Sequence, residues 1–148
     1  MFIKDIRVEE MNKNIDWLVF ERHNFGQLQW RKDMRFWDNT QKSRYIESLL
    51  TIGSINPFVI GTPVSLDYRH IVDGFHRFRA LLEFIRDNEF CLFNLKYLKE
   101  FDGKKFSDLP KSIQRRIEMV GIKVYVIMPE TLPEYYMDVC RTINPNIA

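Results

Sequence analysis

A strand that runs directly into a glycine turn and then into a helix is the feature that most constrains this fold. Residues 68–72 predict a strand, and Asp73 and Gly74 follow it without a spacer. Beyond the turn, apolar side chains recur at three- and four-residue spacing up to about Asn88, which predicts an amphipathic helix. Those side chains are Phe78, Leu81, Leu82 and Ile85.

Predicted helices and strands alternate along the rest of the chain. In chain order, the further predicted strands are residues 17–20, 58–60, 92–95 and 122–128. The further predicted helices are residues 40–52, residues 112–119 and a closing helix that begins at Pro133. Thr40 and Ser112 are expected N-caps, and Gly53 is the expected stop of the first of these helices. Residues 3–11 fit a short strand or a helical turn, and residues 24–36 fit a loop. The alternation favours a mixed α/β fold.

The composition is that of one folded domain. The chain has 148 residues, 45% of them hydrophobic and 12 of them phenylalanine, which suffices for a single packed core. The prolines are scattered and no change of composition marks a linker, so we predict one domain over residues 1–148. No apolar stretch has the length of a membrane span or the pattern of a signal peptide. We therefore expect a cytoplasmic protein without a membrane partner.

The charge and the cysteines restrict the function only weakly. A net charge of +2 is too small to indicate a nucleic-acid binder by itself. Basic residues cluster in two places, which fits either a solvated surface or a nucleic-acid surface. They are Arg31, Lys32 and Arg35, and then Lys111, Arg115 and Arg116. Cys91 and Cys140 lack metal-ligand spacing, and their apolar neighbours indicate buried free thiols.

The turn after residue 72 has the elements of an anion site. Gly74 lets the backbone bend sharply, and the unpaired N–H groups of the following helix lie at its positive end. Arg77 and Arg79 carry planar cations that suit phosphate oxygens, and His76 can donate to phosphate or transfer a proton. A purely structural interpretation also fits, in which Asp73 is an N-cap, Gly74 a turn residue and Arg77 a surface arginine.

Several runs in a fixed order between residues 37 and 144 carry a family resemblance. Residues 71–81 contain Val-Asp-Gly-Phe-His-Arg followed by an apolar helix, and the other runs are residues 42–50, 55–60, 102–110, 114–117, 124–127 and 141–144. Together they resemble the amino-terminal domain of GmrSD-type modification-dependent restriction systems, whose signature is Val-Asp-Gly-Gln-Gln-Arg followed by an apolar helix. The family belongs to the ParB and sulfiredoxin-like superfamily. The resemblance implies that superfamily's fold, a small mixed β-sheet flanked by helices.

The resemblance also implies nucleotide chemistry, because members of the superfamily bind and hydrolyse nucleotides and some branches cleave or load DNA. A nucleoside triphosphate would bind at the turn with Mg²⁺ or another divalent cation. Asp73 would hold the metal ion or orient water, and His76 and Arg77 would complete the catalytic set. The residues expected to contact the nucleotide are Gly74, Phe75, His76, Arg77, Arg79, Arg141 and Asn144.

The chain departs from the family pattern in three ways. Phe75 and His76 replace the paired glutamines, and the upstream Gln-Arg pair before Trp37 has a different spacing. The family's restriction proteins carry a second, nuclease domain, and we expect none in this protein. Sulfiredoxin chemistry needs a cysteine where Phe75 stands, so that activity is excluded.

Three functions of different class fit these observations. The first is a nucleotide-binding domain that hydrolyses a nucleoside triphosphate. The second is a metal-dependent DNase or a DNA-binding module, whose basic clusters would share one face with the turn. The third is a non-enzymatic decoy, or a partner of a separate nuclease or restriction subunit.

Several further residues are given structural or solvated roles. Glu47 is expected to be solvated, His23 and His70 occupy ordinary surface or strand positions, and Asn144 also fits a helix C-terminus before Pro145. The tryptophans are expected to pack in the core. They are Trp17, Trp30 and Trp37.

Overall fold

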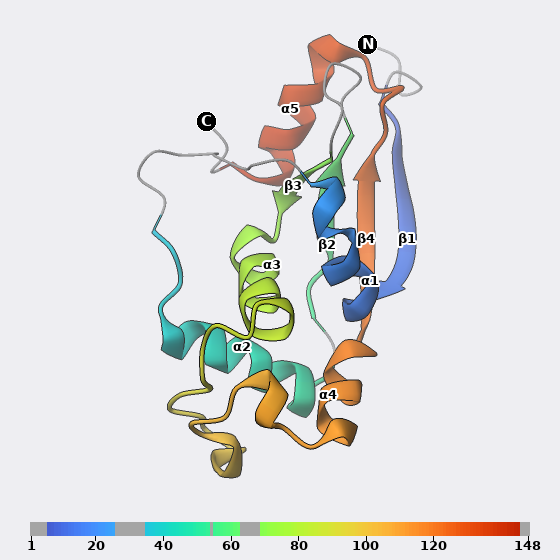
Figure 1. Ribbon diagram of the computed structural model, residues 1–148. Coiled ribbons are helices and arrows are strands. Elements are labelled where there is room, and N and C mark those ends of the chain that lie inside the picture. The colour runs from blue at the N-terminus through green and yellow to red at the C-terminus, as the bar shows by residue number, and fades with distance from the viewer. Residues whose placement is uncertain (1–5, 26–34, 54, 63–68, 146–148) are drawn as a thin grey trace.

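The computed structural model describes residues 6–25, 35–53, 55–62 and 69–145, and its centre is a mixed four-stranded sheet (Figure 1). The strands lie in the order β1 (Val8–Asn14), β4 (Gly121–Ile127), β2 (Phe58–Gly61) and β3 (His70–Asp73). β4 pairs antiparallel with β1 and parallel with β2, and β2 pairs antiparallel with β3. The predicted mixed α/β fold, a small mixed sheet flanked by helices, is confirmed.

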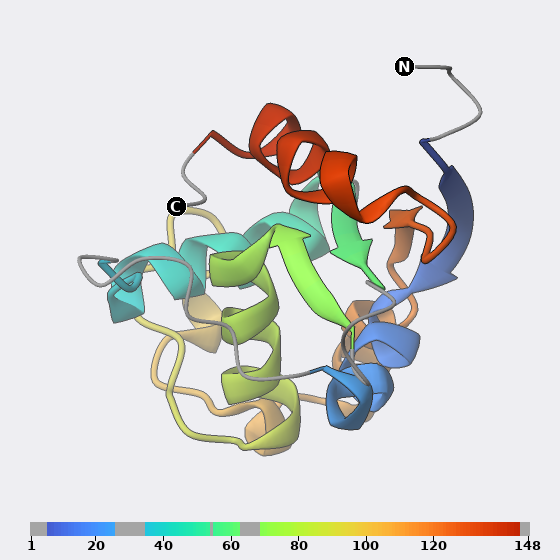
Figure 2. The same ribbon diagram turned by 90° about the horizontal axis from the view of Figure 1, so that it is seen from above.

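Helices cover both faces of this sheet (Figures 1 and 2). One face carries α5 (Pro133–Ile143). The other side carries α1 (Ile15–Phe20), α2 (Asn39–Thr51), α3 (Phe75–Leu81), which continues as a π-helical turn over Leu82–Arg86, and α4 (Lys111–Glu118). Short 3₁₀ turns occupy Glu21–Asn24, Lys99–Phe101 and Phe106–Asp108. Within the described chain, no helix is long and apolar enough to cross a bilayer.

The alternation of side chains along the strands divides the core into two clusters. On β2, Phe58 and Ile60 face the larger cluster, which α1 to α4 complete. Val59 points to the opposite face and packs with Tyr136 and Cys140 of α5. Successive strand residues point to opposite faces, so a strand covered on both sides reads as a continuous apolar run. This explains why β2 was predictable from its composition, whereas β4 was predictable from its Val, Ile and Tyr residues and alternates between exposed and buried residues over its first half.

The strand predicted at residues 17–20 is wrong, because this segment belongs to α1. Asn14 is the N-cap of the helix, and its side-chain oxygen accepts a hydrogen bond from the backbone N–H of Trp17 at 2.8 Å. Ile15 and Leu18 lie three residues apart on one helical face and are fully buried. A short apolar run fits a buried helix as well as a strand, and here the cap at Asn14 favours the helix.

The caps of two helices also differ from expectation. α2 begins with a capping box, in which Asp38 accepts from the N–H of Gln41 and the Gln41 side chain accepts from the N–H of Asp38. Thr40 is therefore inside the helix, and α4 starts after Pro110 without a cap from Ser112. Gly53 is confirmed as a stop, with a φ of 70°. Most of the predicted loop at residues 24–36 lies outside the described residues.

The strand predicted at residues 92–95 is wrong as well. This segment is irregular, and α2 holds it instead of the sheet. The backbone N–H of Phe93 donates to Ser43 Oγ of α2 at 2.9 Å, and the N–H of Leu95 donates to Asp102 Oδ1 at 3.0 Å. Side-chain acceptors thus satisfy backbone donors that a sheet partner would otherwise accept.

Glu47, expected to be solvated, is one of the most buried charged residues of the described chain, at 4% exposure. Its carboxylate accepts hydrogen bonds from the backbone N–H groups of Lys96, Tyr97 and Leu98, at 3.1, 2.8 and 2.8 Å. Burial raises the pKa of Glu47, but these three bonds and the charge of Arg44 outweigh it and hold the pKa below its ordinary value. Glu47 is a structural anchor for the loop below α2.

Candidate functional site

The predicted strand–turn–helix unit is present. β3 ends at Asp73, and Gly74 adopts a left-handed conformation with φ 106° before α3 begins at Phe75. The carbonyl of Gly74 accepts from the N–H of Phe78 at 2.9 Å. A Cβ at Gly74 would lie 2.5 Å from Cδ1 of the buried Phe58 ring, so both the backbone angle and the space require glycine.

Arg77 already makes several contacts within the protein, whereas an arginine that only binds phosphate would have a free guanidinium. Its guanidinium donates to the carbonyls of Asn56 and Pro57, at 2.5 and 3.1 Å. It also lies over the ring of Phe58 at 4.5 Å, and one of its nitrogens is 3.8 Å from the Asp73 carboxylate. Only 15% of its side chain is exposed. Arg77 therefore ties α3 to the segment that enters β2 and keeps a positive charge beside the turn.

Arg79 also has partners within the protein. Its Nε donates to Glu83 at 2.9 Å, and Glu83 in turn pairs with Lys42 of α2 at 2.5 Å. The guanidinium lies 4.0 Å from the ring centroid of Phe36. This network connects α2 with α3 and holds a second cation near the turn.

His76 lies within a cluster of aromatic rings that we call the His76 cluster. Its members are Phe36, Trp37, Tyr45, Phe75 and His76 itself. The imidazole stacks on Trp37 with ring centroids 5.6 Å apart and planes 15° apart. Burial, followed by the nearby charge of Arg79, lowers the pKa of His76, so the ring is neutral at pH 7. Neutral imidazole has one nitrogen that donates and one that accepts.

Two buried side-chain atoms of the described chain lack hydrogen-bond partners, and both belong to the His76 cluster. They are His76 Nδ1 and Tyr45 Oη. Both rings pack against Trp37, with centroid distances of 5.6 and 5.8 Å. Burial, opposed by the charge of Arg77, raises the pKa of Tyr45, which keeps its hydroxyl protonated. The sequence placed Tyr45 in an apolar stripe. The signal that was missed is that a buried tyrosine hydroxyl needs a partner.

Asp73 is the sequence-predicted metal ligand. Its side chain is 47% exposed at the end of β3. No group of three or more His, Cys, Asp or Glu residues that could hold a metal ion occurs in the described part of the chain. One carboxylate suits Mg²⁺ only where phosphate oxygens and water supply the other ligands, as is usual for nucleotide-bound magnesium.

Asn144 lies at the carboxyl end of β3, and Arg141 pairs with a residue of its own helix. Asn144 caps the C-terminus of α5, and its Nδ2 donates to the carbonyl of Val72 at 2.9 Å, one residue before Asp73. The interpretation of Asn144 as a helix C-terminal residue is confirmed, and its expected contact with a nucleotide stays a prediction. Arg141 lies 3.8 Å from Asp138 on the same helix.

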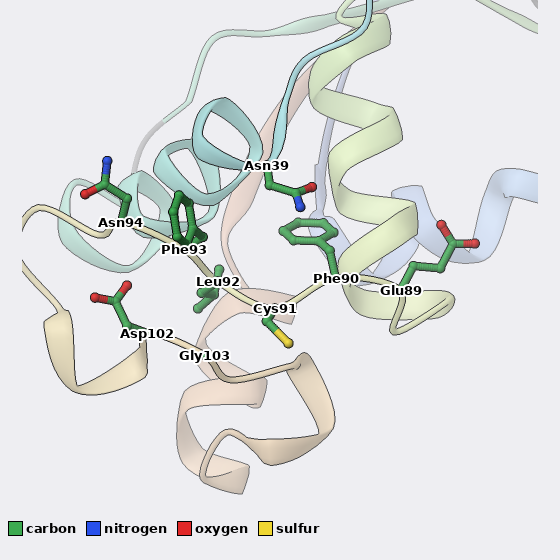
Figure 3. A pocket seen from close by; sticks show the side chains of 9 residues that line it. All are labelled: Asn39, Glu89, Phe90, Cys91, Leu92, Phe93, Asn94, Asp102 and Gly103. Atoms are coloured by element: carbon green, nitrogen blue, oxygen red, sulfur yellow. The ribbon is translucent and has the colours of Figure 1, made fainter.

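An open cavity of about 630 Å³ lies away from the turn, beneath the start of α2 (Figure 3). The residues that line it are Asn39, Glu89, Phe90, Cys91, Leu92, Phe93, Asn94, Asp102 and Gly103. Cys91 is exposed here, so its expected burial is wrong. Cys140 is buried, and its burial raises the pKa of the thiol to about 11. None of the residues from Asp73 to Arg77 lines this cavity.

His70, expected to be an ordinary strand residue, is buried against α5, and its Nε2 lies 2.5 Å from Tyr136 Oη. Burial lowers the pKa of His70 to about 4, against an ordinary value of 6.5. Between about pH 4 and pH 6.5, His70 is therefore protonated in the unfolded chain and neutral in the folded chain. This contribution to stability is complete above about pH 6.5 and is lost as the pH falls towards about 4.

We expect the free energy of unfolding to fall by about 2 kcal/mol between about pH 7 and about pH 5 because of His70. Urea unfolding at the two pH values measures this difference. In His70→Gln, which cannot titrate, the fall over this interval should largely disappear. An unchanged fall in that variant would show that other groups cause it.

The side chains of His23 and Trp30 lie outside the part that the structure describes. Trp17 and Trp37 are partly buried, Trp17 against the main core and Trp37 in the His76 cluster. No protein-family model, curated protein or solved structure matches the chain. The resemblance to the amino-terminal domain of GmrSD-type systems therefore stays a prediction.

Proposed function

We propose that this chain is a nucleotide-binding domain that binds and hydrolyses a nucleoside triphosphate at the turn from Asp73 to Arg77. The observation that supports this most is the pair of unpartnered polar atoms, His76 Nδ1 and Tyr45 Oη. A buried polar group without a partner costs about 1–3 kcal/mol, so a ligand that accepts two hydrogen bonds here gains affinity. Phosphate oxygens are such acceptors, and a tyrosine hydroxyl and a neutral imidazole N–H can both donate to them.

The surrounding charges favour the same ligand. Arg77 and Arg79 keep two guanidinium groups beside the turn, and their existing bonds to carbonyls and to Glu83 hold them in place. The first backbone N–H groups of α3 have no acceptor within the helix. We assign Arg77 to electrostatic stabilisation and to holding the turn, and assign direct hydrogen bonds to His76 and Tyr45.

The exposed carboxylate of Asp73 completes the proposal. It would supply one oxygen ligand to a magnesium ion carried by the nucleotide, or orient the attacking water. Such an ion would neutralise phosphate charge during the transfer. We place this activity in the cytoplasm, where the two free thiols of the described chain would stay reduced.

A thermal-shift screen of ATP, GTP, CTP, UTP and their diphosphates with Mg²⁺ tests the proposal. A nucleotide at 100 times its dissociation constant should add about 2.7 kcal/mol to the stability. In Tyr45→Phe, removal of an unpartnered buried hydroxyl should leave the apo protein as stable as before or more stable, while the nucleotide shift becomes smaller. His76→Phe keeps an aromatic ring against Trp37 and should likewise reduce the shift.

Arg77→Ala is a poor probe, because it also breaks the bonds to Asn56 and Pro57. Glu100→Gln, in the exposed 3₁₀ turn at Lys99–Phe101, serves as a control that should keep the full nucleotide shift. If no nucleotide stabilises a cooperatively melting protein, the proposal is wrong. A role as a decoy or partner protein would then be the better explanation.

A further inference from the structure

One end of the molecule, away from the turn, carries a concentration of positive charge. The segment from Lys96 to Arg116 contains seven basic and three acidic side chains, which leaves a net charge of +4 there against +2 for the whole chain. The basic residues are Lys96, Lys99, Lys104, Lys105, Lys111, Arg115 and Arg116, and all are exposed. In Figure 1 this segment forms the lower end of the molecule, below α2 and α3. We call it the basic face.

Among the described residues, the cations of the basic face form no ion pair, although Lys96 lies over the Tyr97 ring and the charges of Arg115 and Lys111 act on Glu118. Seven ion pairs join described residues, and none of them involves a residue of the basic face. Two of the three carboxylates in the basic face accept hydrogen bonds from backbone N–H groups. Asp102 Oδ1 accepts from the N–H of Leu95, and Asp108 Oδ2 accepts from the N–H of Lys105, each at 3.0 Å. The acidic groups thus stabilise the loop, while the basic groups extend into solvent.

The backbone beneath these cations is held in one conformation. Glu47 accepts from three successive N–H groups at residues 96–98. The N–H of Leu92 donates to the carbonyl of Lys104 at 2.9 Å, and the N–H of Gly103 donates to the carbonyl of Leu92 at 2.7 Å. Gln114 of α4 donates to the carbonyl of Leu109 at 2.9 Å. A fixed backbone lowers the ordering cost of binding, so this is a preorganised cationic surface.

Exposed aromatic rings lie within and beside the basic face. Tyr97 is 64% exposed, and Lys96 lies over its ring at 5.2 Å. Phe93, which lines the cavity of Figure 3, is 59% exposed. Cations that follow a phosphate backbone and aromatic rings on which bases stack are the two elements of sequence-independent binding to single strands. Bases within a duplex are already stacked and cannot use such rings.

We propose that the basic face binds single-stranded nucleic acid, with phosphates on the lysines and arginines and a base on Tyr97. This surface is separate from the turn, so the proposal does not depend on nucleotide binding there. It uses residues 96–116, whereas the turn proposed to bind nucleotide lies where β3 leads into α3, away from this segment (Figure 1).

Fluorescence anisotropy with a labelled thymidine oligomer of about twenty nucleotides tests the proposal, at several salt concentrations. We expect binding at low ionic strength that weakens as salt rises. Lys104→Gln/Lys105→Gln and Arg115→Gln/Arg116→Gln should each weaken binding. Each pair should reduce the slope of log Kd against log salt by about 1.4, if two phosphate contacts are lost. Lys13→Gln/Lys123→Gln removes the same charge from β1 and β4 and should change neither quantity more than slightly.

Substitution of Tyr97 tests base stacking separately from charge, because it leaves the net charge of the protein unchanged. Tyr97→Ala should weaken binding roughly 5- to 150-fold with an unchanged salt slope, and Tyr97→Phe should restore it. Absence of binding at low ionic strength, or an equal loss in Lys13→Gln/Lys123→Gln, would overturn the proposal. Equal affinity for a duplex together with no effect of Tyr97→Ala would overturn the assignment to single strands. None of these variants changes the turn, so the nucleotide-induced thermal shift reports on the other proposal separately.

Discussion

Replacement of Gly74 by alanine is expected to lower the free energy of unfolding by about 3–4 kcal/mol. An L-residue in the left-handed region costs about 1–2 kcal/mol, and Gly74 has a φ of 106°. The new Cβ would also lie 2.5 Å from the Phe58 ring, which is fully buried and cannot move away without disturbing the core. Overpacking of this kind costs a further 1–3 kcal/mol or so.

Gly53→Ala is the matched control for this substitution. Gly53 also has a positive φ, 70°, but a Cβ there would meet nothing within 4 Å. It should therefore show the backbone cost alone, about 1–2 kcal/mol. Urea unfolding of both variants separates the two causes. Equal destabilisation in the two variants would show that the contact with Phe58 is relieved at little cost.

Replacement of Glu47 by alanine is expected to lower the free energy of unfolding by about 3 kcal/mol. The substitution removes three hydrogen bonds between a carboxylate and the backbone of residues 96–98. Bonds to a charged group contribute more than neutral ones, although water can reach part of this loop and replace some of the loss. Glu47→Gln keeps one acceptor oxygen and should cost less, about 1–2 kcal/mol.

The pH dependence gives a second test of Glu47. Its pKa is below the ordinary value, so its contribution is present above about pH 4.5 and is lost as the pH falls through the folded-state pKa. Glu100→Ala, on the exposed loop beside this anchor, should change stability by less than about 0.5 kcal/mol. If Glu47→Ala proves as mild as Glu100→Ala, the carboxylate does not anchor the loop.

Loss of the Glu47 anchor should also affect the basic face. Because Glu47 orders the backbone of residues 96–98, Glu47→Ala should weaken the binding of single strands although it removes a negative charge. A purely electrostatic surface would respond in the opposite direction.

Local pattern was sufficient where one short stretch contained all the information. β2 is a continuous apolar run because both faces of the sheet are covered there, whereas β4 is rich in Val, Ile and Tyr and exposes Lys123. The turn at Gly74 and the stop at Gly53 follow from the conformational freedom of glycine. The helices at α2 and α3 follow from their apolar periodicity, and α5 follows from Pro133 in its first turn.

Local pattern failed where a distant or overlooked group determined the outcome. The apolar run at residues 17–20 is helical because Asn14 caps it. Residues 92–95 lie outside the sheet, where Ser43 of α2 and Asp102 accept hydrogen bonds from their backbone N–H groups. A glutamate at the edge of an apolar stripe looked solvated, but Glu47 is buried by a loop some fifty residues away in the chain.

The amino-acid sequence by itself determined the mixed α/β class, most of the elements and the strand–glycine–helix turn, because these depend on residues close together in the chain. Only the tertiary structure decided what the turn's side chains do. Arg77 is committed to carbonyls at residues 56 and 57, and Tyr45 of α2 joins His76 beside Trp37. The basic face likewise depends on tertiary contacts, because the carboxylates of Glu47, Asp102 and Asp108 accept hydrogen bonds from backbone N–H groups. Hydrogen-bond partners and burial depend on contacts between distant segments, which no local pattern encodes.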